Sequence, residues 1–233
     1  MMKKSIVYKI LAVVLGIAIV VVGMKDVKMY LSGKVLNLNT ATKDDFKKEC
    51  IVEGDINYVV GNFAIYEEKD KTLGITTSKR KTKYYLVENL SMDELKRIME
   101  SDAEDYTYPD NYFAYVVSAS SDEMKDALDA NIQGWMDYYD NKTDKMPEPV
   151  HFEGKLWREP AESKYKNYKQ QALDKWGFDD NDEIAELKAM DNRPGKSSIL
   201  VIVLGALLAL GGLAFIIVPL VLGRTKKTDV EYY

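Results

Sequence analysis

Few residues of this chain have side chains that could carry out chemistry, and their spacing argues against catalysis. His151 is the only histidine and Cys50 the only cysteine, so a histidine zinc site or a Ser-His-Asp triad would depend on one residue. The run Asp179–Glu183 has the composition of a calcium loop, but Ile184 stands where an EF-hand needs glycine. Phosphate-binding and dinucleotide-binding glycine loops are missing from the sequence. We therefore expect a protein that is not an enzyme and has no metal and no cofactor.

One dense basic run is the other candidate for a binding site. It contributes four cations, Lys79, Arg80, Lys81 and Lys83. Cationic side chains are attracted to anionic lipid headgroups, and each contributes about 1 kcal/mol near such a surface. We predict that these four residues contact the membrane or a partner. A solvated hairpin loop accounts for the same pattern and is the alternative.

The element that must position the rest of the chain is an uncharged stretch, Ile199–Leu222. A helix needs about 20 apolar residues to cross the hydrocarbon core, so this stretch predicts a membrane span. A second apolar stretch, Ser5–Met24, is interrupted only by Lys9, whose long side chain can reach the headgroups. We predict an uncleaved signal anchor here. A cleaved signal peptide is the alternative, with Val21-Val22-Gly23 as an imperfect cleavage site.

Positive charges flank both spans on the side of the chain ends. Lys3 and Lys4 precede the first span, and Arg224, Lys226 and Lys227 follow the second. By the positive-inside tendency, both termini are cytoplasmic and the segment between the spans is extracytoplasmic. We therefore expect a multi-pass protein of the cell membrane, with the lipid bilayer as one of its partners.

Each span carries two small residues four positions apart. These are Ala12 and Gly16 in the first span and Gly205 and Ala209 in the second. Small residues at this spacing let helix backbones approach closely, so the spans can pack as a hairpin or pair with a partner, including a second copy of the chain. Neither span has Asp, Glu, Arg or His at mid-membrane depth, which argues against a pore or a pump.

The segment between the spans is long enough for one domain with its own core. Because the chain ends are basic, this segment is more acidic than the net charge of −5 of the whole chain. Nucleic-acid binding depends on clustered Lys and Arg, so we expect no nucleic-acid partner. The predicted boundaries are a cytoplasmic N-terminus at 1–4, transmembrane helices at 5–24 and 198–223, an extracytoplasmic domain at 25–197 and a cytoplasmic tail at 224–233.

The pattern of apolar residues in the middle segment changes between strand and helix types. β-Branched and aromatic residues predict strands within 34–39, 50–66, 84–87, 112–118 and 150–157. Capping boxes at Ser91–Glu94 and Ser120–Glu123 predict the starts of two helices. Tyr165–Gly177 predicts a third helix and Asp182–Met190 a short fourth.

Two strand segments share an apolar-Glu-Gly-polar-apolar pattern, Val52–Ile56 and Phe152–Leu156. A glycine inside a strand often marks a bulge or a sharp bend. We therefore predict an α+β fold in which two transmembrane helices flank one mixed α+β domain with a curved antiparallel sheet that could be barrel-like.

The order of these elements resembles that of a group of known proteins. A span, a β-rich acidic domain with the motifs Val52–Ile56, Tyr84–Val87 and Phe152–Leu156, a late helix and a second span with a basic tail are similar to uncharacterised two-span membrane proteins of Gram-positive bacteria. The resemblance implies this architecture and carries no activity with it.

We expect the chain to be a membrane-anchored extracytoplasmic interaction or sensing module, or an accessory subunit of an envelope assembly. Its partner would be another membrane or envelope protein. The alternative is a membrane-anchored cell-envelope hydrolase that uses carboxylates. A pocket with two convergent acids would favour the hydrolase, whereas an exposed sheet edge or a flat apolar patch would favour the interaction module.

Overall fold

The structure is a computed structural model and describes residues 2–72, 75–100, 107–178 and 184–225. The chain divides into two compact units. The first unit comprises Met1–Gly33 and Pro194–Tyr233 and contains the helices α1 (Met2–Ser32) and α5 (Lys196–Thr225). The second unit, Lys34–Arg193, contains the seven described strands and is called the domain below.

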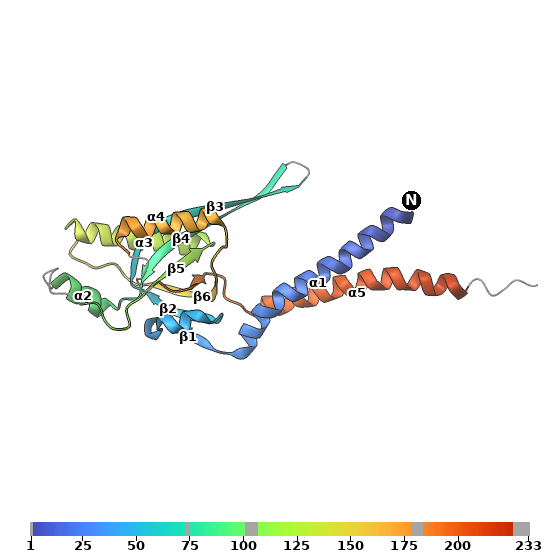
Figure 1. Cartoon of the computed structure of the whole chain (residues 1–233), viewed down its shortest axis with the longest axis horizontal. Coiled ribbons are helices and arrows are strands. Elements are labelled where there is room, and N and C mark those ends of the chain that lie inside the picture. The colour runs from blue at the N-terminus through green and yellow to red at the C-terminus, as the bar shows by residue number, and fades with distance from the viewer. Residues whose placement is uncertain (1, 73–74, 101–106, 179–183, 226–233) are drawn as a thin grey trace, which may run out of the picture. The chain divides into compact units, whose positions relative to one another are not determined.

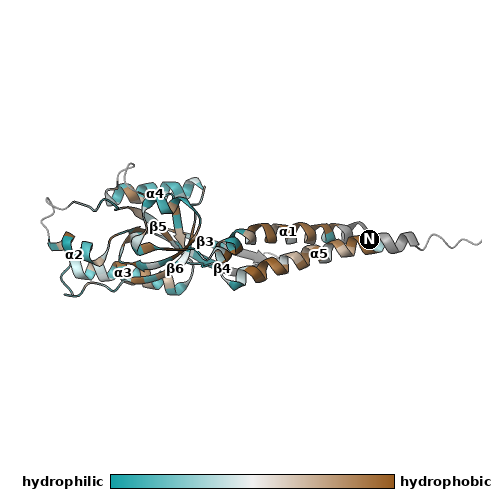
Figure 2. Cartoon of the chain, turned by 90° about the horizontal axis from the view of Figure 1, so that it is seen from below, coloured by the Kyte–Doolittle hydropathy of each residue, from teal (hydrophilic) through white to brown (hydrophobic). Residues whose placement is uncertain are grey.

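Helices α1 and α5 are each long and apolar enough to span a membrane. Figure 2 shows that strongly hydrophobic residues follow both helices along most of their length. Helix α1 continues past the predicted end at Met24 to Ser32, and Gly33 with a φ of +63° ends it. The two helices pack against each other, so this unit is a helical hairpin.

The domain is built on a seven-stranded sheet in the order β1-β2-β6-β7-β5-β4-β3. Strand β1 is parallel to β2 and β5 is parallel to β7, whereas the other neighbouring pairs are antiparallel. Figure 1 shows β3 and β4 continuing beyond their neighbours as a two-stranded arm. The strands are β1 (Val35–Asn37), β2 (Ile51–Ile56), β3 (Tyr58–Thr72), β4 (Ile75–Glu88), β5 (Ala114–Ala119), β6 (Val150–Arg158) and β7 (Leu187–Met190).

The sheet is mixed and open, so the prediction of an antiparallel, barrel-like sheet is wrong in its details. Its two edges are β1, which has three residues, and β3. A barrel would require these two edges to pair. Helices cover parts of both faces instead, and a sheet that is covered on both faces needs no closure to bury its apolar side chains. The mixed α+β class itself is confirmed.

The two strands with the shared Glu-Gly pattern are direct neighbours. Strand β2 pairs with β6 so that Glu53 lies opposite Glu153. A Cβ on Gly154 would lie 2.0 Å from the carbonyl oxygen of Met190, and a Cβ on Gly54 would lie 2.6 Å from the Asn39 side chain. These glycines therefore allow close approach of neighbouring segments, rather than the barrel curvature that the sequence suggested.

Helices α3 (Asp122–Tyr139) and α4 (Ser163–Trp176) pack on opposite faces of the sheet (Figure 2). Because side chains alternate along a strand, Tyr85 of β4 joins the buried cluster that includes Leu128 of α3. Its neighbour Leu86 joins the cluster that includes Leu173 of α4. The other helical elements are the 3-10 turns Leu38–Thr40 and Lys43–Lys47 and the helix α2 (Met92–Glu100).

The predicted helix ends and starts are partly confirmed. Ser91 and Glu94 exchange the two hydrogen bonds of a capping box at the start of α2, and Gly177 with a φ of +79° ends α4. At α3 the cap is Ser121 instead of Ser120. The helix predicted for Asp182–Met190 is wrong where the structure describes it, because Leu187–Met190 is strand β7 in the centre of the sheet.

Candidate functional site

A cavity of about 650 Å³ lies where β3, β4 and the start of α4 meet, and we call it the aromatic groove. Its volume falls in the range of about 300–1,000 Å³ that is typical of ligand cavities. The lining residues are Phe63, Ala64, Ile65, Tyr66 and Glu67 of β3, Tyr84 of β4, and Pro160, Glu162, Lys164, Tyr165 and Tyr168 in and before α4.

The floor of the aromatic groove is packed, and its rim is exposed. The buried rings of Tyr84 and Tyr165 meet edge to face with their centroids 5.0 Å apart, and the ring of Phe63 lies 5.8 Å from Tyr165. Aromatic pairs at such distances hold each other in place. On the rim, by contrast, Ile65 is 59% exposed and Tyr66 is 46% exposed. A ligand would therefore find a preformed floor and apolar surface at the rim.

The edge strand β3 also lines the aromatic groove. Successive strand residues point to opposite faces, yet five consecutive residues from Phe63 to Glu67 line the cavity. The register shift between Asn62 and Ala64 lets Phe63 and Ala64 pack against the same cluster, and Ile65 to Glu67 continue the lining along the strand. Among the described strands, β3 pairs with β4 alone, so the other edge of β3 offers its backbone N–H and C=O groups to a ligand.

Three charged side chains, from Glu159, Lys169 and Lys188, lie close to the residues that form the floor. Lys169 of α4 and Glu159 form an ion pair of 2.7 Å that is largely buried. The ammonium of Lys188 lies 4.9 Å from the centre of the Tyr84 ring, and burial lowers the pKa of this lysine to about 8. The hydroxyl of Tyr165 is buried and has no hydrogen-bond partner among the described residues. The Lys169–Glu159 pair therefore ties α4 to the segment that follows β6.

A second cluster lies on β2 and β6, on the sheet face away from α3. One ligand atom each from Glu53, His151 and Glu153 lies within 4.8 Å of the others, which is close enough to hold a metal ion. The guanidinium of Arg193, however, binds Glu53 at 2.9 Å and Glu153 at 2.7 Å. A hydrogen bond to Asp55 raises the pKa of His151. Because Arg193 bridges both glutamates, we assign this cluster to anchoring the end of the domain.

A small polar cavity of about 130 Å³ lies beside the end of β4. Glu88, Asp55 and Glu94 are the acidic residues in its lining. Burial raises the pKa of Glu88 to about 7, although a hydrogen bond from Tyr112 opposes the shift. A carboxyl group with such a pKa can donate or accept a proton near neutral pH. The cavity is nevertheless smaller than the few hundred Å³ that ligand sites usually need.

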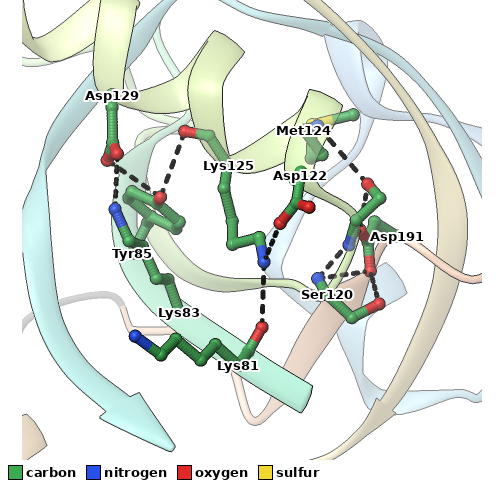
Figure 3. A network of polar contacts seen from close by, with 10 residues as sticks. Lys81, Lys83, Tyr85, Ser120, Asp122, Met124, Lys125, Asp129 and Asp191 are labelled. Atoms are coloured by element: carbon green, nitrogen blue, oxygen red, sulfur yellow. Dashed lines mark hydrogen bonds and ion pairs between the residues drawn. The ribbon is translucent and has the colours of Figure 1, made fainter. Parts of the chain in front are cut away.

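The four residues of the predicted basic run are separated by the structure. Lys83 forms an ion pair of 2.5 Å with Asp129 of α3, which also accepts a hydrogen bond from Tyr85 (Figure 3). Arg80 and Lys81 are exposed on the arm, which we define as Tyr66–Thr72 and Ile75–Thr82. Lys79 is in β4, but its side chain lies outside the part of the chain that the structure describes. Lys83, which follows the arm directly in β4, therefore links β4 to α3.

The same region anchors the chain where it leaves the sheet. Asp191, which follows β7, accepts hydrogen bonds from the backbone N–H and hydroxyl groups of both Ser120 and Ser121 (Figure 3). Lys125 pairs with Asp122 at 2.6 Å and donates to the carbonyl oxygen of Lys81 at 3.1 Å. Ser120, the predicted cap of α3, therefore binds Asp191, and Ser121 caps the helix instead.

The small residues of the two spans lie at the interface between α1 and α5. A Cβ on Gly16 would lie 2.6 Å from the carbonyl oxygen of Gly205 and 2.9 Å from the Cβ of Ala209. Three of the four predicted packing residues therefore meet within one hairpin. Ala12, the fourth, is partly exposed in α1.

Sequence reasoning missed the aromatic groove. Tyr165 and Tyr168 are recognisable in the sequence as part of an apolar helix stripe, and Ile65-Tyr66 as part of a strand. One signal was available in the sequence. The apolar segment that ends at Tyr66 is followed directly by a run of charged residues, a pattern typical of a strand that leaves the sheet. The meeting of the two segments depends on tertiary packing.

Comparison with known proteins gives one match. No curated protein and no solved structure matches the chain at the level required for a significant match. A family model described as a domain of unknown function matches residues 1–221, which include both long helices and the domain. The chain therefore belongs to the family DUF8577.

Proposed function

We propose that this chain is a two-span membrane protein whose extracytoplasmic domain binds an extended segment of another membrane or envelope protein in the aromatic groove. In such a role it acts as an interaction module or as an accessory subunit of an envelope assembly. The observation that carries this proposal is that β3, an edge strand of the sheet, lines a cavity with aromatic walls. An exposed edge combined with side-chain pockets is how extended peptides are recognised by strand addition.

The membrane part of the proposal is supported by length and charge. Two helices are long and apolar enough to span the bilayer. Lys3 and Lys4 precede the apolar part of α1 in the sequence, and Arg224 and Lys226 lie at or after the end of α5. The positive-inside tendency then favours cytoplasmic termini and an extracytoplasmic domain.

A polypeptide suits the aromatic groove better than a compact small molecule does. The groove runs along five consecutive residues of β3, which is a length of about 16 Å at the usual rise of a strand. A partner strand would gain backbone hydrogen bonds along this edge, and its alternate side chains would contact Tyr66 and Tyr168 at the rim.

The test is photo-crosslinking in cells that express the full chain. A photoreactive phenylalanine analogue replaces Tyr66, or Tyr168, on the rim. The matched control is Tyr139 of α3, which is 49% exposed compared with 46% for Tyr66. We expect the two rim positions to form adducts with one segment of a single protein, and the control position to form none with it. Adducts with glycan or lipid only, or equal labelling at the control, would contradict the proposal.

Two proline variants separate edge pairing from simple apolar contact. Adjacent strand residues point their N–H groups to opposite edges, so only one of Ile65→Pro and Tyr66→Pro removes a donor from the free edge while the β3–β4 ladder is kept. We expect that variant to lose the adduct with the domain still folded. Retention of the adduct in both variants would show that the edge is not used.

A carboxylate hydrolase is the second candidate, and Glu88 is the observation that favours it. Its pKa of about 7 suits a general acid, and two further acids share its cavity. Hydrolysis of cell-envelope polymers by the purified full chain, lost in Glu88→Gln, would support this candidate. Equal release of products by the wild-type protein and the variant would reject it.

A further inference from the structure

Helix α5 contains a proline, Pro219, near its C-terminal end. Proline has no backbone N–H, so the carbonyl group four residues earlier lacks its usual partner within the helix. In α5 this carbonyl belongs to Phe215. A backbone carbonyl without a partner is costly inside a bilayer, because no water is present to take the place of the missing donor.

The missing donor comes from α1. The ammonium of Lys9 donates a hydrogen bond of 2.9 Å to the carbonyl oxygen of Phe215. Lys9 is also the one charged residue within the apolar stretch Ser5–Met24, where a lysine needs a polar partner or a path to the headgroups. A lysine ammonium and an unpaired backbone carbonyl are each unfavourable in a membrane, and here the ammonium of Lys9 donates to the carbonyl of Phe215.

Close packing brings the two groups together. A Cβ on Gly212 would lie 3.1 Å from the carbonyl oxygen of Lys9 and 2.8 Å from the side chain of Val13. Further along the hairpin, Gly16 makes a similarly close contact with Gly205 and Ala209. The hairpin interface is therefore continuous up to Lys9, and the contact of Lys9 with Phe215 is the polar end of that interface.

We propose that Lys9 is an intramembrane latch that closes the carbonyl freed by Pro219 and thereby fixes the register of the hairpin. A slide of α1 by one residue would move the lysine away from the carbonyl that Pro219 frees. The latch also makes α1 a permanent structural partner of α5, which a cleavable signal peptide would not be. The contact between Lys9 and Phe215 lies within the hairpin and does not depend on whether the aromatic groove binds a protein.

The test is a double-mutant cycle on the full chain in membranes. Cys50→Ala removes the native thiol, and Ile19→Cys with Gly205→Cys report the register, because a Cβ on Gly205 would lie 3.1 Å from the Cβ of Ile19. That separation is slightly below the usual distance of about 3.5–4.5 Å in a disulfide. The variants compared in this background are Lys9→Met, Pro219→Ala and both together. Lys4→Met is the control, because it removes the same charge from the same end of the chain.

We expect Lys9→Met to slow disulfide formation by about threefold to thirtyfold, the range set by one hydrogen bond in a membrane. The double variant should form the disulfide as fast as Pro219→Ala alone, because an alanine in place of the proline restores the donor within the helix. Lys4→Met should have no effect. An unchanged rate in Lys9→Met, or an equal slowing with and without Pro219, would overturn the proposal, the latter because Lys9 would then act through its charge alone.

Discussion

Replacing Glu88 with glutamine should change how the stability of the domain depends on pH. Glu88 ends β4 and lines the small polar cavity. Burial raises its pKa from 4.5 to about 7, since the protein interior disfavours the charged carboxylate. Glutamine has nearly the same shape as the protonated acid and cannot ionise. The variant therefore removes one titration and little else.

The magnitude follows from the two pKa values. A shift of 4.5 to about 7 corresponds to about 3 kcal/mol at about 1.4 kcal/mol for each pKa unit. The folded state binds this proton more tightly than the unfolded chain does, so the stabilisation is complete below pH 4.5 and is lost as pH rises through 7. At about pH 4, below both pKa values, the wild-type protein and Glu88→Gln should have similar unfolding free energies. At about pH 8 the variant should be more stable by about 3 kcal/mol.

The assay is urea unfolding of the full chain in detergent micelles, followed by tryptophan fluorescence. The three tryptophans, Trp135, Trp157 and Trp176, all belong to the domain, so the signal reports that unit. Other groups titrate in the same range, including His151, and the difference between wild type and variant cancels them. Glu186→Gln, at an exposed position, is the control and should show no such difference. A gap between Glu88→Gln and wild type that is the same at both pH values would refute the reasoning.

Three further predictions concern the sheet, the exit from the domain and the membrane. Gly154→Ala should destabilise the domain by about 3 kcal/mol or more, because its Cβ would lie 2.0 Å from the carbonyl oxygen of Met190; urea unfolding measures this, and a loss below about 1 kcal/mol would contradict the close approach. Asp191→Ala removes the acceptor of Ser120 and Ser121 and should cost about 2 kcal/mol, whereas Asp191→Asn should recover part of the loss in the same assay. Protease added to intact cells should cut the domain from outside, and the mass of the mature chain should still include α1; protection of the domain until lysis would invert the proposed topology, and a chain that begins near Met24 would show a cleaved signal peptide.

Helix starts and ends could be predicted where they depend only on residues that are close together in the sequence. The capping box at Ser91–Glu94 closes with its own two side chains, and Gly177 adopts the positive φ that ends α4. The apolar side of α3 was readable in the same way, with Leu128 and Trp135 buried. Errors arose where a local pattern had to compete with a distant one. The segment Asp182–Met190 was predicted to be a helix. Leu187–Met190 is instead a strand, because it pairs with both β5 and β6 in the sheet.

The candidate site was beyond reach of the sequence for the same reason. Phe63 and Tyr165 meet although they lie far apart in the sequence, and no periodicity within either segment specifies that contact. Likewise, the repeated Glu-Gly pattern drew attention to β2 and β6 without showing that Glu53 faces Glu153, or that Arg193 bridges them. Side-chain pairs across a sheet depend on the register, which is a property of the folded chain.

The sequence by itself determined that the chain has two apolar helices long enough to cross a membrane, with an acidic α+β segment between them, because hydrophobic length and periodicity act locally. Only the tertiary structure decided the strand order, the free edge of β3 beside the aromatic groove, and the hydrogen bond from Lys9 to the carbonyl freed by Pro219. Each of these depends on which distant segments become neighbours. That choice is made by the packing of the whole chain, in which burial and backbone pairing are satisfied together.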